Sequence, residues 1–162
     1  MNNLIVRALT GIVFVAVLVG GTLYSPISFT VLFALITALT TWEFSTNVNA
    51  YAGASVNRLI NTVAAVYLFV AFSGFCADLV PSKAFIPYLI SIIYLLVSEL
   101  YLEKPDPLKN WGYAFASQIY VALSLSLLNV LAWRYDPMTN HTAFVPIYPL
   151  SVFLFLWTSD TG

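Results

Sequence analysis

Four carboxylate side chains lie at or near the ends of apolar segments, where an ionised group could do chemistry at a membrane surface. They are Glu43, Asp78, Glu99 and Asp160. Insertion scales assign roughly 2.5–3.5 kcal/mol to one charged residue at mid-membrane. A carboxylate in that position therefore needs a compensating partner, and a divalent cation is one that oxygen ligands favour.

Structural roles compete with this chemistry at three of the four positions. Asp78 begins a short polar run with a proline, at 78–83, and is typical of a turn residue in water. Glu43 and Glu99 can reach the lipid headgroup zone, so a structural or interfacial role competes with a functional one.

Asp160 follows an apolar run and has the strongest case for chemistry. If the last helix begins at about Phe144, Asp160 lies about 24 Å across the bilayer, short of the far surface. A metal ion, a lysine from another segment, or a role as the cap of the next helix would each account for it.

Other reactive side chains are scarce. The single cysteine, Cys76, cannot close an intramolecular disulfide, and the single histidine, His141, cannot form half of a multi-histidine metal site. Cys76 lies among apolar neighbours and is interpreted as a packing residue. Zinc chemistry and a disulfide scaffold are therefore excluded.

The composition determines the class of protein that positions these groups. Of the 162 residues, 60% are hydrophobic and 8% are charged, against about 45–50% and about 25% in soluble domains. The formal net charge is -1, and the basic residues are scattered, so nucleic acid is not expected as a partner. We predict an all-α, polytopic integral membrane protein.

Lengths of apolar sequence divide the chain into about six transmembrane helices. Residues 8–42 carry no charge, and one helix of that length would reach about 52 Å against a hydrocarbon core of roughly 30 Å. A break is expected at 20–26, where Gly20 and Gly21 permit a turn and Pro26 can open the next helix. Polar connections are predicted at 45–58, 78–83, 103–110 and 134–141. The expected spans are 8–22, 27–44, 59–76, 84–102, 111–133 and 144–157.

The distribution of basic residues favours a cytoplasmic N-terminus. In that orientation Arg7, Arg58, Lys104 and Lys109 face the cytoplasm, and two basic residues face outward, as the positive-inside rule prefers. A cleaved signal peptide competes at the N-terminus, but no small-x-small cleavage site follows the apolar run.

Three sequence elements stand out along the chain: an Arg-x-x-Thr-Gly opening at Arg7, Trp42-Glu43-Phe44 at the end of the second expected span, and Trp157-Thr158-Ser159-Asp160-Thr161-Gly162. Together they resemble bacterial phosphatidate cytidylyltransferases, also called CDP-diglyceride synthases. The resemblance covers the chain in layout, and 1–162 is interpreted as the N-terminal transmembrane region of a longer membrane enzyme. The family's C-terminal signature, which contains a His-Gly-Gly, is missing from this sequence.

The resemblance implies a CTP:phosphatidate cytidylyltransferase of phospholipid biosynthesis, with phosphatidic acid and CTP as substrates. It implies Mg²⁺ as cofactor, a possible homodimer, and a multi-pass location in the bacterial cytoplasmic (inner) membrane. Of the family's catalytic and metal-binding residues, only Asp160 is carried over, so this part of the chain is expected to be inactive alone.

Two other functions remain open from the sequence. A small membrane transporter or channel subunit would place polar groups or broken helices at mid-bilayer, but spans three to five lack charges in their central thirds. A related CTP-dependent polyprenol kinase would use similar chemistry on a different lipid.

Overall fold

The computed structural model describes the backbone of residues 2–161 and the side chains of residues 5–160. Helices account for 80% of the structure, as the all-α prediction requires. Within the described residues, five helices are long and apolar enough to cross a membrane. They are Ile5–Tyr24, Pro26–Tyr51, Arg58–Cys76, Ser82–Tyr101 and Pro107–Ala132.

The first two helices meet at a sharp corner. Helix α1 (Asn2–Tyr24) continues through both glycines, and only Ser25 separates it from α2 (Pro26–Tyr51). The break therefore lies within the expected range 20–26, and Pro26 opens the next helix as expected. Ser25 caps α2 by accepting a hydrogen bond from the Ser28 backbone N–H at 3.0 Å, and the Ser28 hydroxyl donates to the Gly21 carbonyl at 2.7 Å. A Cβ at Gly21 would lie 2.6 Å from Leu32 Cδ2, so glycine here permits close approach of the two helices.

Polar connections are shorter than the sequence indicates. Helix α2 extends to Tyr51, so residues 45–51 of the predicted loop are helical, and α3 (Arg58–Cys76) begins after a connection at 52–57. The expected fourth span consists of a short 3₁₀ helix η1 (Ser82–Phe85) and α4 (Ile86–Tyr101). The connection that follows is only 102–106, because Pro107 starts the next helix.

The fifth expected span is one rod with a change of helical pitch. It consists of α5 (Pro107–Ser117), a π-helical turn η2 (Gln118–Leu123) and α6 (Ser124–Ala132). A π turn inserts a residue into the helical repeat, and such turns are frequent at functional sites.

The predicted polar connection at 134–141 lies within a β-hairpin. Strands β1 (Trp133–Asp136) and β2 (His141–Phe144) pair antiparallel, with Trp133 opposite Phe144. The turn is held by Asp136, whose carboxylate accepts hydrogen bonds from the Met138 backbone N–H and the Thr139 hydroxyl. Both hydrogen bonds lower the pKa of the Asp136 carboxyl, and the one from Met138 has the larger effect.

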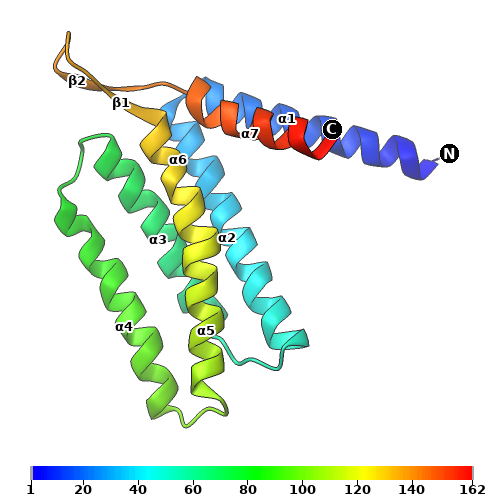
Figure 1. Cartoon of the computed structure of the whole chain (residues 1–162), viewed down its shortest axis with the longest axis vertical. Coiled ribbons are helices and arrows are strands. Elements are labelled where there is room, and N and C mark those ends of the chain that lie inside the picture. The colour runs from blue at the N-terminus through cyan, green and yellow to red at the C-terminus, as the bar shows by residue number, and fades with distance from the viewer. Residues whose placement is uncertain (1, 162) are drawn as a thin grey trace.

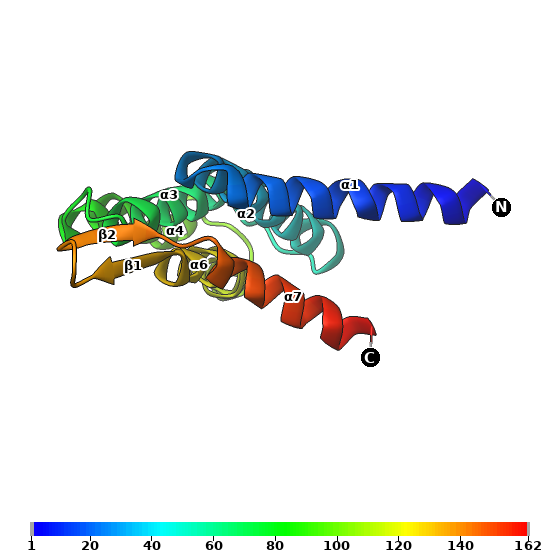
Figure 2. The same cartoon turned by 90° about the horizontal axis from the view of Figure 1, so that it is seen from above.

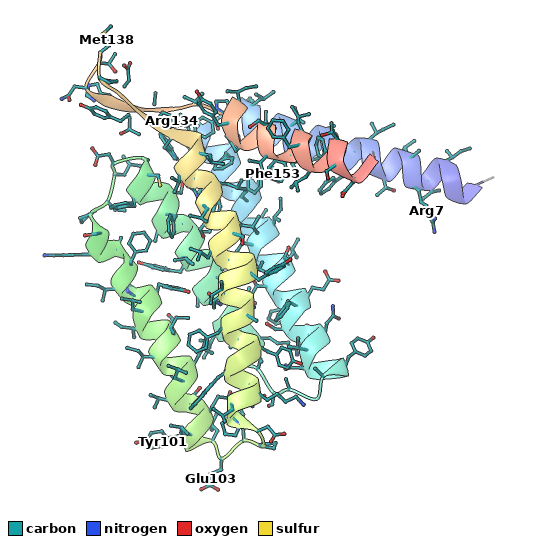
Figure 3. The ribbon with its side chains drawn as sticks, in the orientation of Figure 1. Arg7, Tyr101, Glu103, Arg134, Met138 and Phe153 are labelled. Atoms are coloured by element: carbon teal, nitrogen blue, oxygen red, sulfur yellow. The ribbon has the colours of Figure 1, made fainter. Side chains whose placement is uncertain are left out.

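The helices run in two directions (Figure 1). The four rods formed by α2, α3, α4 and α5–η2–α6 lie along the long axis of the molecule, whereas α1 and α7 (Ile147–Thr161) extend to one side. Figure 2 shows that α1 and α7 diverge toward the ends of the chain. We call the end of the bundle beside the β-hairpin the hairpin end, and the end with connections 52–57 and 102–106 the loop end. Figure 3 shows Met138 and Glu103 at these opposite ends.

The sixth expected span is therefore not confirmed. Helix α7, with 15 residues, is not among the five helices of the described residues that are long and apolar enough to cross a membrane. It also lies across the bundle (Figure 1), so Asp160 is not carried down alongside the spanning helices.

Apolar packing concentrates at the hairpin end. Phe29 and Phe33 of α2 are fully buried and contact Phe69 of α3, with ring centroids 6.4 Å apart in each pair. Phe144 and Phe153 extend the aromatic cluster to the hairpin and α7. Leu18, Leu128, Ala132 and Leu150 complete the buried core there.

We predict that hydrocarbon covers α1. Most of its described side chains are apolar and exposed, Ile12 to 69%, and a helix that is apolar on most sides is stable in lipid or within protein. In a Cys76→Ala background in native membranes, Ile12→Cys should react with a water-soluble maleimide at least about tenfold more slowly than Met138→Cys at the hairpin tip. Equal rates at the two positions would contradict the embedding of α1.

Candidate functional site

Buried polar side chains gather toward the loop end in two clusters. One centres on Asn61 of α3 and the other on Glu99 of α4, and both are almost completely buried. In a bilayer such groups have no water to bind, so protein partners must satisfy them.

Asn61 connects three rods. Its Nδ2 donates hydrogen bonds to the hydroxyls of Ser45 at 3.0 Å and Ser117 at 2.7 Å. Gln118 Nε2 donates to both the side-chain and main-chain oxygens of Asn61, each at 2.8 Å. Helices α2 and α3 and the α5–η2 junction are thus held in register by one amide.

The π turn begins at the residue that contacts this amide. Gln118 is its first residue and is 2% exposed. Its Oε1 and the Thr41 hydroxyl are buried and have no hydrogen-bond partner among the described residues. A cavity beside Gln118 and Trp111 has only about 10 Å³ of room for the centre of a water molecule, roughly one water.

Glu99 anchors the second cluster. Its carboxylate pairs with Lys104 at 2.7 Å and accepts a hydrogen bond from Asn110 Nδ2, also at 2.7 Å. Lys104 also donates to the Ser55 carbonyl, and the Ser55 backbone N–H donates to Asn110 Oδ1. Glu99 thus joins both connections at the loop end, and these contacts support a structural role.

Glu43 and Asp78 are not part of these clusters. Glu43 is exposed on α2. The guanidinium of Arg58 lies over the ring of the neighbouring Trp42, 5.0 Å from the ring centroid. Helix α2 continues eight residues beyond Glu43, so Trp42-Glu43-Phe44 does not end the helix as expected. Asp78 is exposed with φ of 59° just after α3, as expected of a turn residue.

Asp160 lies exposed in the last turn of α7. An N-cap residue has non-helical dihedral angles, so its helical conformation does not support the interpretation of Asp160 as a cap. The structure does not bring Glu43 close to Asp160. Helix α7 lies across the hairpin end (Figure 1), whereas Glu43 is about 26 Å along α2 from Pro26, which begins at that end. Gly162, the last residue of its motif, lies outside the described residues.

The described residues do not form a complete magnesium site. They contain no group of three or more His, Cys, Asp or Glu side chains that could hold a metal ion. Asp160 alone supplies carboxylate oxygens where Mg²⁺ requires near-octahedral coordination by several oxygen ligands.

The charge pattern of the expected spans gives no sign of the Asn61 cluster, because its side chains are uncharged. Asn61, Ser117 and Gln118 lie within expected spans or at their margins, and uncharged polar residues there commonly bond between helices. The informative signal was the presence of Asn and Gln in apolar segments.

Comparison of the chain with protein-family models, curated proteins and solved structures finds no match.

Removal of one partner of the Glu99–Lys104 pair should destabilise the bundle. Lys104→Met leaves a buried carboxylate without its cation, and we expect a loss of about 2–4 kcal/mol in unfolding free energy. The partial exposure of Lys104 keeps this loss below that of a fully buried pair. Lys109→Met, at an exposed lysine of the same end, is the matched control and should have little effect.

The double variant Glu99→Gln/Lys104→Met should recover more than half of that loss, since no charge remains buried. Denaturant unfolding in mixed micelles measures all three variants. A loss for Lys104→Met no larger than that for Lys109→Met would show that the pair is not structurally important.

Proposed function

We propose that this chain is the N-terminal membrane region of a CTP:phosphatidate cytidylyltransferase. The observation that carries the proposal is Asp160, an exposed carboxylate in α7 within the sequence Trp157-Thr158-Ser159-Asp160-Thr161-Gly162. The Trp42-Glu43-Phe44 element and the membrane-spanning character of five helices support it.

The proposed reaction transfers CMP from CTP to phosphatidic acid. A phosphate oxygen of phosphatidic acid forms a bond to the α-phosphorus of CTP as the bond to pyrophosphate breaks, giving CDP-diacylglycerol and pyrophosphate. Catalysis of such a transfer consists mainly of aligning two anions and stabilising charge. Asp160 is the residue of this chain assigned to that site, and further donors come from residues outside this chain.

We place the loop end in the cytoplasm of a bacterial cell, at the inner membrane. Arg58, Lys104 and Lys109 lie near that end, whereas Lys83 and Arg134 lie near the hairpin end. Arg7 lies far along α1 (Figure 3) and belongs to neither end. The bias is therefore three basic residues against two, which supports a cytoplasmic loop end.

Reporter fusions test this orientation. A reporter active only in the cytoplasm should be active when fused after Glu103 and inactive when fused after Asn140. Both fusions lie in connections, so the helices before each junction stay intact. The reverse pattern would show that the bundle is inverted.

We expect the 162-residue chain alone to make no CDP-diacylglycerol, because a single carboxylate cannot organise a triphosphate and a phospholipid. The complete gene product should make it. Membranes containing either protein are incubated with labelled CTP and phosphatidic acid, and a parallel sample receives a polyprenol. The polyprenol sample receives γ-labelled CTP, and label in the polyprenol would favour the kinase. Label in lipid from membranes that contain only the 162-residue protein would contradict the expectation.

Asp160→Asn in the complete gene product should lower turnover at least about tenfold, or about 1.4 kcal/mol of transition-state stabilisation. Asparagine preserves the size of the side chain but removes its charge. Asp78→Asn is the matched control, since Asp78 is an exposed turn residue, and should retain full turnover. Normal turnover of Asp160→Asn would remove Asp160 from the site.

A further inference from the structure

A groove of about 330 Å³ follows one face of α5 at the loop end. The residues that line it are Lys109, Gly112, Tyr113 and Ala116. Their i, i+3, i+4, i+7 spacing places them on one side of the helix. Gly112 and Ala116 are exposed, so the groove opens on the outer surface of the bundle. Its volume is at the lower limit of ligand sites, roughly 300–1,000 Å³.

Lys109 gives this groove a cation that has no counterion in the protein. Its side chain is exposed, and its ammonium group makes no hydrogen bond or ion pair with any of the described residues. The backbone N–H of Lys109 donates to the Asp106 carbonyl at 3.0 Å, but the Asp106 carboxylate does not pair with the ammonium group. Basic groups at the ends of membrane helices attract anionic lipid headgroups. The groove therefore favours a ligand with a negative charge.

The connection between α2 and α3 fixes the position of this charge. A Cβ at Gly53 would lie 3.6 Å from Lys109 Nζ, so the ammonium group lies against the connection at the loop end. Tyr113 packs against the buried side chains of Ala54 and Val56 from the same connection. Its hydroxyl makes no hydrogen bond with the described residues. The groove thus offers two polar donors, and both belong to residues that contact the loop end.

The polarity of the groove changes along α5. Lys109 lies in the first turn of the helix, and Ala116 lies about 10 Å further along the axis, toward the interior of the bundle (Figure 1). Gly112 and Ala116 leave that part of the groove apolar, and a Cβ at Gly112 would meet no atom within 4 Å. A phospholipid has the same order, with an anionic headgroup followed by hydrocarbon. A free anion would leave the apolar part uncovered.

We propose that this groove binds an anionic diacylglycerophospholipid, with its headgroup phosphate paired to the Lys109 ammonium group. One acyl chain lies over Gly112 and Ala116, where no large side chain occupies the helix surface, and the Tyr113 hydroxyl donates to the headgroup. The site is on α5 at the loop end, whereas Asp160 is on α7, which lies across the hairpin end (Figure 1). It therefore does not rest on the proposed enzymatic function.

Photolabelling tests the site directly. The full chain is reconstituted in vesicles of phosphatidylcholine that contain a small fraction of phosphatidylglycerol with a diazirine on one acyl chain. Phosphatidylglycerol is anionic but has no phosphate monoester to receive CMP, so binding is separate from the proposed reaction. Label should concentrate in peptide 109–116, and unlabelled phosphatidylglycerol should compete at least about fivefold better than phosphatidylcholine. Even labelling of all spanning helices, or equal competition, would overturn the proposal.

A pair of lysine variants tests the charge. Lys109→Gln keeps a long polar side chain but removes the cation, so the two lipids should then compete equally. Lys83→Gln is the matched control, because Lys83 is an exposed lysine near the hairpin end, and it should keep the preference for phosphatidylglycerol. A preference that survives Lys109→Gln would overturn the assignment of the headgroup.

A pair of glycine variants tests the groove. Gly112→Leu enters open space, and leucine favours helix over glycine, so the fold should be kept while the groove is filled. Labelling of peptide 109–116 should fall at least about fivefold. Gly20→Leu also enters open space, on α1, and should leave labelling unchanged. Equal effects of the two variants would overturn the site. If Gly112→Leu instead dissociates an oligomer without reducing labelling, the groove is an interface between copies and the lipid proposal is wrong.

Discussion

The Asn61 side-chain amide is the interaction on which the arrangement of the bundle depends. In hydrocarbon no water competes for its donors and acceptors, so each must find a protein partner. Its partners come from α2 and from the α5–η2 junction, and these positions can meet only in one register. The π turn at Gln118 accompanies this constraint, because it starts at the residue that reaches back to Asn61. Helix association in lipid commonly relies on such interhelical hydrogen bonds together with close packing.

The two ends of the bundle are stabilised by different forces. At the hairpin end, Phe29, Phe33 and Phe69 pack in a fully buried cluster. Lipid tails are as apolar as these rings, so the cluster contributes through dispersion and shape rather than through removal from water. At the loop end, Glu99 and Asn61 make directional contacts that tolerate only one geometry. The aromatic end therefore supplies contact area, and the polar end determines which helices are neighbours.

The sequence located five of its six expected spans, two of them to within two residues at either end, and missed the helical continuation of the second span. Composition and the length of uncharged runs located five spans, because these depend only on bilayer thickness. The helix through 45–51 was missed because its polar residues are typical of loops, yet Ser45 is buried against Asn61 and Asn49 bonds the backbone of Val56. Gly20 and Gly21 suggested a turn, but Gly21 serves close packing against Leu32. The burial of Glu99 depends on Lys104 and Asn110, which come near it only when α4 and α5 pair. These contacts and the burial of these residues depend on tertiary packing, which the local sequence pattern does not reveal.

The corner at Ser25 governs where Asp160 can act. Helix α1 and helix α7 leave the bundle on the same side (Figure 2), and the bond from the Ser28 hydroxyl to the Gly21 carbonyl fixes the angle of α1. Leu18 of α1 and Leu150 of α7 share one core with Phe33, so the orientations of the two arms are coupled through that core. Both arms lie across the long axis of the bundle (Figure 1). The packing of Leu150 at the hairpin end, ten residues before Asp160, therefore governs where the Asp160 carboxylate lies relative to the bundle.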